Sequence, residues 1–204
     1  MKLYDGGRAP NPRRVQIFFK EKSFNIPTVQ LDLNAHEHRN EAMTQKNPTQ
    51  TVPFLELEDG TVISETIAIC RYVEELVPEP NMFGETPVER ALIEMWNRRV
   101  EVGFFLSVGQ SFRHLHPGGA ILEGEQIPDW GRKNQTKAIA FLKLLDDQLT
   151  ENEFIAGARF SVADITAISS FQFFKPARLE LPEGGLSGVR RWLNVVSARP
   201  SVKL

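Results

Sequence analysis

The stretch TVPFLELEDGTVISET, residues 51–66, indicates the fold of this chain more directly than any other segment. Residues 54–57 and 61–63 are two short runs of strand-forming character, and the Asp-Gly pair between them is typical of a tight β-hairpin turn. From Thr66 onward the apolar residues repeat at helical spacing until Pro78 interrupts the pattern. The stretch therefore predicts a β-hairpin that leads directly into a helix.

The segment before this hairpin predicts a strand, a helix and a second strand. Residues 2–5 alternate polar and apolar side chains, and residues 28–33 do so again. Between them, Val15, Phe18 and Phe19 have the spacing of one helix face. A strand, a helix and a strand in this order cross over into a parallel pair. We therefore expect an α/β fold for the N-terminal part of the chain.

Strand patterns end before residue 87, and helical patterns fill the remainder. Pro80 and Gly84, which follow Pro78, are typical of a linker. We therefore expect an α/β domain over residues 1–78, a linker over residues 79–86 and an all-helical domain over residues 87–204.

Within the second domain, one long helical pattern runs from Arg90 to about His114, and others cover residues 138–149 and 189–198. Ser161 and Asp164 have the spacing of a helix-capping box. Trp130 follows a proline and precedes a glycine, and we place it in a loop.

Composition excludes several classes of protein. The 204 residues carry a formal net charge of -2 and no long run of like charge, which argues against a nucleic-acid partner. No apolar stretch approaches the ~20 residues that span a bilayer, and the N-terminus lacks an apolar signal segment, so we expect a cytoplasmic protein and no membrane partner. Cys70 is the lone cysteine, which excludes an internal disulfide and a cysteine-based zinc site. We assign no metal.

Val52-Pro53 is the first motif with chemical content. Pro53 stands at the start of a strand, where the missing N–H costs little and a cis peptide bond can be selected. A cis bond would turn the backbone of Val52 outward, so that its N–H and C=O can pair with an extended peptide. An ordinary trans proline is an equally good interpretation of the spacing.

Ser64-Glu65-Thr66 is the second motif, at the start of the helix after the hairpin. A helix N-terminus has unpaired N–H groups and a partial positive charge, which suit a carboxylate. Thr66 can donate to that carboxylate while Glu65 attracts an ammonium group, so the pair can bind an amino-acid head group. On physical grounds alone we favour a plainer interpretation, in which Ser64 is the N-cap and Glu65 complements the helix dipole.

Taken together, several motifs resemble those of bacterial cytosolic glutathione transferases, including their nu-like members, along essentially the whole chain. These motifs are PNPRRV (residues 10–15), Asn47-Pro48, Val52-Pro53, SETIAI (residues 64–69) and FSVADI (residues 160–165). The resemblance implies a thioredoxin-like N-terminal domain that binds glutathione. It also implies an all-α C-terminal domain that supplies the electrophile site and dimer contacts, and hence a homodimer.

The resemblance further implies which residues hold glutathione. Val52-Pro53 matches the cis pair that binds the backbone of the glutathione cysteine, and Glu65 with Thr66 matches the pair that binds the γ-glutamyl group. His38 resembles a histidine that meets the glycine carboxylate in some classes. Thr51 stands where a lysine or glutamine is often found for the same carboxylate.

The catalytic position departs from the familiar classes. Ala9 stands where many members carry a serine or cysteine, so a hydroxyl or thiol is missing beside the glutathione sulfur. Asn11 is our first candidate, because Ala-Pro-Asn resembles the Thr-Pro-Asn of nu-like members and its amide can donate to a thiolate. Tyr4 is the second candidate, although we favour a strand residue whose hydroxyl is already bonded. Arg13 and Arg14 either raise the local potential or are solvated first-turn arginines.

The family's electrophile pocket maps to the end of the long helix, where we select Phe105, Phe112 and His114. Aromatic residues at helical spacing are more often part of a core, and that interpretation stays open. We expect conjugation of glutathione to small hydrophobic or aromatic electrophiles, with glutathione-dependent disulfide reductase or peroxidase activity as a variant. The alternative is a non-catalytic binding or regulatory module with the same fold, which Ala9 and Thr51 favour and the other motifs oppose.

Overall fold

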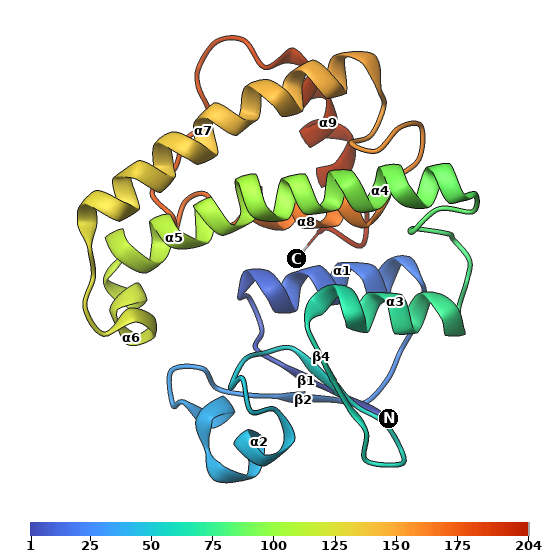
Figure 1. The fold of residues 1–204 in the computed structure, drawn as a ribbon, viewed down its shortest axis with the longest axis vertical. Coiled ribbons are helices and arrows are strands. Elements are labelled where there is room, and N and C mark those ends of the chain that lie inside the picture. Colours follow the sequence, from blue (N-terminus) through green and yellow to red (C-terminus); the bar gives the residue numbers. More distant parts are fainter. Residues whose placement is uncertain (204) are drawn as a thin grey trace. The chain divides into compact units, whose positions relative to one another are not determined.

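The computed structural model describes residues 1–203, which form two compact units, Met1–Asn81 and the remainder from Met82 onward (Figure 1). The first unit combines a four-stranded mixed sheet with helices, and the second is helical. The predicted fold class is therefore confirmed. No helix within residues 1–203 has the length and apolar composition needed to cross a membrane.

The sheet of the first unit has the strand order β2-β1-β3-β4. The β1–β2 pair is parallel, as predicted, and β3 pairs antiparallel with both β1 and β4, so the predicted hairpin is present. The second strand is shorter than predicted, because the Asp32 carboxylate accepts the amides of Asn34 and Ala35 and turns the chain away. The strands are β1 (Lys2–Asp5), β2 (Thr28–Gln30), β3 (Phe54–Glu56) and β4 (Val62–Ser64).

Helices lie on both faces of this sheet (Figure 1). Helices α1 (Pro10–Glu21) and α3 (Thr66–Leu76) lie side by side on one face, and the short α2 (Glu41–Lys46) lies on the other. Successive side chains along each strand point to opposite faces of the sheet. Tyr4 and Phe54 form a buried cluster with Met43 of α2 on one face, and the residues next to them in each strand point to the other face. Each face of the sheet is therefore covered.

A buried lysine fixes the relative direction of α1 and α3. Lys22 follows the last turn of α1, and its ammonium lies 2.6 Å from the carboxylate of Glu74 near the end of α3. The same Nζ donates to the carbonyl oxygens of Val77, Pro78 and Pro80, at 2.7 to 2.9 Å. Since the two helices end at one ammonium and differ in length by one residue, their N-termini also lie at one edge of the unit.

The second unit is built from helices. A short π-helical turn, Glu101–Phe105, joins α4 to α5, so that the helical path continues without a break. The long helical pattern predicted from Arg90 to His114 is therefore confirmed in its extent. Trp130 was placed in a loop, and this is wrong, because Pro128 begins α7 and Trp130 belongs to its first turn. The helices are α4 (Pro87–Val100), α5 (Leu106–Leu115), α6 (Ala120–Glu123), α7 (Pro128–Glu151), α8 (Val162–Gln172) and α9 (Ser187–Ser197).

The buried carboxylate of Asp164 organises the second unit. It accepts hydrogen bonds from the amide and hydroxyl of Ser161, the amide of Ile155 and the indole of Trp192, at 2.7 to 3.0 Å. Burial raises the pKa of Asp164, and these donors oppose that rise. The predicted capping box at the start of α8 is present, and its carboxylate also holds α9 and the segment before α8.

Replacement of Lys22 by methionine is expected to destabilise the first unit strongly. It would leave the carboxylate of Glu74 and three carbonyl oxygens buried without their cation, which costs roughly 3–5 kcal/mol when one partner of a buried pair is removed. Chemical denaturation of Lys22→Met measures this loss, with Lys20→Met, an exposed position on the same helix, as the control. Equal stabilities for the two variants would contradict the structural role of Lys22.

Candidate functional site

The segment before β3 presents an unpaired stretch of backbone. The Val52-Pro53 peptide bond is cis, so of the two interpretations left open by the sequence the structure has the cis form. Within residues 1–203, neither the N–H nor the C=O of Val52 makes a hydrogen bond with another backbone group. An extended peptide can therefore pair with both groups, in the manner of strand addition at a sheet edge.

A buried asparagine holds the loop that leads to Val52. Asn47 is almost fully buried, and its amide nitrogen donates to the carbonyl oxygen of Thr51 at 2.9 Å. Its amide oxygen accepts the hydroxyl of Thr49 at 2.8 Å, and the hydroxyls of Thr49 and Thr51 lie 2.8 Å apart. Sequence reasoning used Asn47 only as part of a motif. Its role as the anchor of this loop depends on contacts with residues two to four positions away.

Gly6 is a site residue that sequence reasoning missed. A Cβ atom at this position would lie 2.6 Å from Cγ2 of Val52, closer than side chains approach one another. The chain between β1 and α1 therefore packs directly against Val52 only because residue 6 is a glycine. The adjacent glycines at positions 6 and 7, immediately after a strand, were the available signal.

The start of α3 lies beside the same loop. Phe54 pairs with Ser64 across the hairpin, which places Glu65 and Thr66 next to Val52-Pro53. The N-cap of α3 is Glu65, not Ser64, so the plainer interpretation of this motif is wrong about the capping residue. Glu65 is exposed and has a φ of 69°, a conformation that non-glycine residues seldom adopt. The Glu65 side chain therefore faces solvent, whereas Thr66, the first residue of α3, is 6% exposed.

The start of α1 presents one asparagine between two prolines. Pro10 and Pro12 have no N–H, and the N–H of Arg13 donates to the carbonyl oxygen of Ala9 at 3.0 Å. Asn11 therefore carries the one N–H group in the first turn of α1 that has no helical partner within residues 1–203. The Asn11 side chain is exposed, and its oxygen accepts a hydrogen bond from Arg14 at 3.3 Å.

Arg13 and Arg14 are both buried, so of the two interpretations left open by the sequence, that of solvated first-turn arginines is wrong. Burial lowers the pKa of Arg13. Neither helix start carries an acidic residue in its first turn, so the partial positive charges of α1 and α3 at this edge are not neutralised from within.

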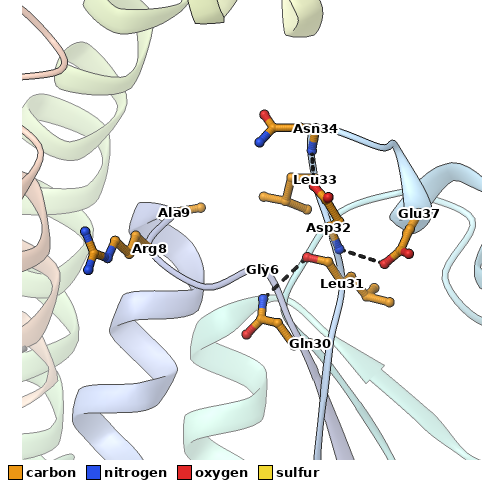
Figure 2. A pocket seen from close by; sticks show the side chains of 9 residues that line it. All are labelled: Gly6, Arg8, Ala9, Gln30, Leu31, Asp32, Leu33, Asn34 and Glu37. Atoms are coloured by element: carbon orange, nitrogen blue, oxygen red, sulfur yellow. Dashed lines mark hydrogen bonds between the residues drawn. The ribbon is translucent and has the colours of Figure 1, made fainter.

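A hollow of about 620 Å³ opens beside Ala9, at the carboxyl ends of β1 and β2 (Figure 2). Ala9 is the N-cap of α1 and offers no side-chain hydrogen bond to it. The carboxylate of Glu37 accepts the amide of Asp32 at 2.7 Å, and Figure 2 shows Arg8 pointing away from both acids. The lining consists of Gly6, Arg8, Ala9, residues 30–34 and Glu37.

Tyr4 lies in the core of the first unit. Its ring stacks on Phe54 with centroids 4.4 Å apart, and its hydroxyl donates to the carboxylate of Glu56 at 2.8 Å. Glu56 also pairs with Lys46, and these two bonds lower the pKa of Glu56 to about 2. Tyr4 is therefore a strand residue whose hydroxyl is already bonded, which is the interpretation that we favoured over a catalytic role.

His38 is buried in the turn before α2, and its Nδ1 has no hydrogen-bond partner within residues 1–203. Burial, with smaller contributions from Arg39 and His36, lowers the pKa of His38. The imidazole is therefore neutral at pH 7 and retains an unused polar atom.

The three residues selected for an electrophile pocket lie in the second unit. Phe105 is half-buried in the π-helical turn, and Phe112 contacts the rings of His116 and Phe173 at centroid distances of 4.9 Å. His114 is buried, and its Nδ1 accepts the amide of Ile127 at the start of α7 at 3.1 Å. That hydrogen bond gives His114 a structural role that its sequence position did not indicate.

The remaining chemistry-bearing groups lie apart from this edge. The pKa of the Cys70 thiol is raised to about 12 by burial, which leaves it protonated and unreactive. Over residues 1–203, no group of three or more histidine, cysteine, aspartate or glutamate side chains is arranged to hold a metal ion.

Comparison with protein-family models gives matches in both units. Residues 1–75 match the model described as the glutathione S-transferase N-terminal domain, and residues 128–194 match the glutathione S-transferase C-terminal domain. The chain is 37% identical over 206 residues to glutathione S-transferase 2 of Saccharomyces cerevisiae, in a match that covers 100% of this chain and 88% of the yeast protein.

Solved structures are similar over both units as well. A glutathione S-transferase domain-containing protein of Marinobacter aquaeolei has a TM-score of 0.95 and 42% identity, with 100% of each chain covered. A class Gtt2 glutathione S-transferase of Vibrio parahaemolyticus has a TM-score of 0.86 and 35% identity, covering 100% of this chain and 96% of that one.

Substitution of Gly6 by alanine is expected to displace Val52, because the new Cβ atom and Cγ2 of Val52 cannot both keep their positions. Such overpacking costs about 1–3 kcal/mol in unfolding free energy. The NMR signal of the Val52 amide should shift, and denaturation should show the loss. Gly109→Ala is the control, since its Cβ atom would meet nothing within 4 Å. An unchanged Val52 signal in Gly6→Ala would contradict the proposed contact.

Proposed function

This chain belongs to the glutathione S-transferase family, and on that premise we propose that its first unit binds glutathione, activates the thiol and conjugates it to small hydrophobic or aromatic electrophiles. One observation carries the proposal. The unpaired backbone of Val52, the start of α1 and the start of α3 lie at the same edge of one sheet. A tripeptide with two carboxylates and a thiol finds complementary groups along that edge.

The central residue of glutathione is assigned to Val52. An extended cysteinyl residue would donate its N–H to the C=O of Val52 and accept the N–H of Val52, as in an antiparallel ladder. The cis bond to Pro53 and the anchoring of Thr51 by Asn47 support this assignment, because they hold the Val52 backbone in one orientation.

The γ-glutamyl group is assigned to the start of α3. Its carboxylate would accept the hydroxyl and N–H of Thr66, where the helix dipole favours negative charge. Its ammonium would lie against the carboxylate of Glu65, which is exposed and directed by an unusual backbone conformation. A zwitterionic head group satisfies both halves of this arrangement.

The glycine carboxylate is assigned to His38 and Thr51, on the other side of Val52. Within residues 1–203, the Nδ1 atom of His38 has no partner but is buried, and the Thr51 hydroxyl donates to that of Thr49, which itself donates to Asn47. Both groups would have to turn toward the carboxylate to donate to it. Lys46, the nearby cation, already pairs with Glu56. This end of the peptide is therefore held by neutral donors.

Activation of the thiol is assigned to Asn11. A free thiol has a pKa of about 8.5, and lowering it by ~2 units requires ~2.7 kcal/mol of preferential stabilisation of the thiolate. Charge-assisted hydrogen bonds contribute ~1.5–3 kcal/mol and a helix N-terminus up to ~2 kcal/mol. Asn11 supplies two donors at that helix end, its N–H and its side-chain NH₂, so the missing hydroxyl at Ala9 does not prevent activation.

Chemistry at this edge would use thiols from glutathione alone. Cys70 is buried and protonated, so a protein thiol cannot form or resolve a mixed disulfide there. Disulfide or peroxide reduction, the variant activity, would require a second glutathione to complete each cycle.

A homodimer in the cytoplasm completes the proposal. Val88 and Leu92 on α4, with Val102 and Leu106 further along the same helical path, are 42 to 68% exposed and offer an apolar stripe for a second copy. Sedimentation velocity tests this part, and a monomer at micromolar concentration would contradict it.

The direct test of the proposal is an ultraviolet difference titration of glutathione bound to the protein. We expect thiolate absorbance to persist to about pH 6.5, about two units below the pKa of the free thiol. Asn11→Ala should return the pKa of the bound thiol most of the way toward 8.5. If calorimetry on the same sample shows no glutathione binding, a non-catalytic module with the transferase fold becomes the better description.

Replacement of Glu65 by glutamine should weaken glutathione binding at least tenfold, about 1.4 kcal/mol. The substitution keeps the shape of the side chain and removes only the charge that attracts the γ-glutamyl ammonium. Calorimetry measures the effect, and Glu75→Gln, exposed near the other end of α3, is the control. A dissociation constant equal in both variants would refute this subsite.

A further inference from the structure

Arg14 is a buried cation that the proposed function does not use. Arg14 is 2% exposed, and one guanidinium nitrogen donates to the side-chain oxygen of Asn11 at 3.3 Å. Its charge also acts on α3. Burial raises the pKa of the Cys70 thiol, and the positive charge of Arg14 lowers it in part. Arg14 is thus a fixed positive charge behind the exposed amide at the start of α1.

This hydrogen bond decides which end of the Asn11 amide faces solvent. The oxygen and nitrogen of an asparagine amide have nearly the same shape, and the last torsion of the side chain has a broad, roughly twofold profile. A guanidinium carries hydrogen-bond donors only. It can therefore donate to the amide oxygen of Asn11 and cannot pair with its NH₂ group. With the oxygen turned to Arg14, the NH₂ group is left to face outward.

An oriented donor is worth more to a thiolate than a rotating one. An exposed asparagine on its own would present its oxygen to the incoming sulfur as readily as its nitrogen, and an oxygen would repel the thiolate. Fixing the donor before the charge develops removes the cost of reorganisation at that step. A charged partner on the oxygen also polarises the amide and strengthens its N–H donors.

We propose that Arg14 is a positioning residue for thiol activation, which acts by holding the amide of Asn11 with its NH₂ group toward the glutathione sulfur. The inference rests on the proposed function, because it requires glutathione at Val52 and its sulfur at the start of α1. It differs from a direct electrostatic role for Arg14, in which the positive charge would stabilise the thiolate whether or not Asn11 is present.

A double-mutant cycle on the 204-residue chain tests it. The variants are Arg14→Met, Asn11→Ala and the double substitution, and the readout is the pKa of protein-bound glutathione from its thiolate absorbance. Calorimetry gives the glutathione dissociation constant and thermal denaturation the folded fraction. Lys20→Met removes an exposed positive charge from the same helix and is the matched control.

We expect Arg14→Met to raise the pKa of bound glutathione by about one unit in the presence of Asn11, a tenfold loss of acidity, and to have little further effect in Asn11→Ala. The control should leave the pKa unchanged. An equal rise in both backgrounds, or no rise in either, would overturn the inference. If Arg14→Met does not fold, Arg14→Gln takes its place with the same criterion, because a neutral amide offers both a donor and an acceptor and does not select the Asn11 oxygen.

Failure of the proposed function would look different. In that case the wild-type protein itself would not bind glutathione or would not lower the pKa of its thiol, before any substitution is made. A lowered pKa in the wild type, lost in Asn11→Ala and insensitive to Arg14, would keep the proposed function and remove only the role of Arg14.

Discussion

The arrangement of the first unit depends on the burial of one ammonium group. Lys22 is surrounded by the carboxylate of Glu74 and three carbonyl oxygens, and a charge removed from water is tolerated only with such partners. Lys22 follows α1, and its partners belong to the end of α3 and the segment after it, so satisfying the charge brings the two helix ends together. The opposite ends, where both helices begin, are then placed at one edge of the sheet.

The positive potential of the two helix N-termini at that edge is kept because their first turns carry no acidic residue. Two prolines remove N–H groups from α1 so that Asn11 carries its unpaired donor. Glu65, the N-cap of α3, is exposed, and its carboxylate makes no capping hydrogen bond to that helix. A site for an anionic sulfur and a zwitterionic head group can therefore be built without a catalytic hydroxyl.

The second unit meets a comparable constraint with the opposite charge. The Asp164 carboxylate is fully buried, which raises its pKa, and four hydrogen bonds offset part of the cost. Because Trp192 and Ile155 are among the donors, one carboxylate fixes the start of α8, helix α9 and the loop between α7 and α8. Each unit is thus organised by one buried ionisable side chain that bonds to a segment distant in sequence, residues 74–80 for Lys22 and Trp192 for Asp164.

Local patterns in the sequence determined the elements of this protein. The Asp-Gly turn predicted the hairpin, Pro78 predicted the end of α3, and the Ser161 and Asp164 spacing predicted the start of α8, because each depends on residues a few positions apart. The same reasoning identified Val52 and Glu65 as candidates, and the family resemblance added Asn11. It left the cis bond undecided and assigned the N-cap of α3 to the wrong residue. Only the tertiary structure decided that Gly6 packs on Val52, that the Tyr4 hydroxyl is bonded to Glu56, and that Arg14 is buried behind Asn11. Those outcomes depend on which side chains share a face or a buried volume, and spacing along the chain carries no information about the charge or bulk that a distant segment brings into contact.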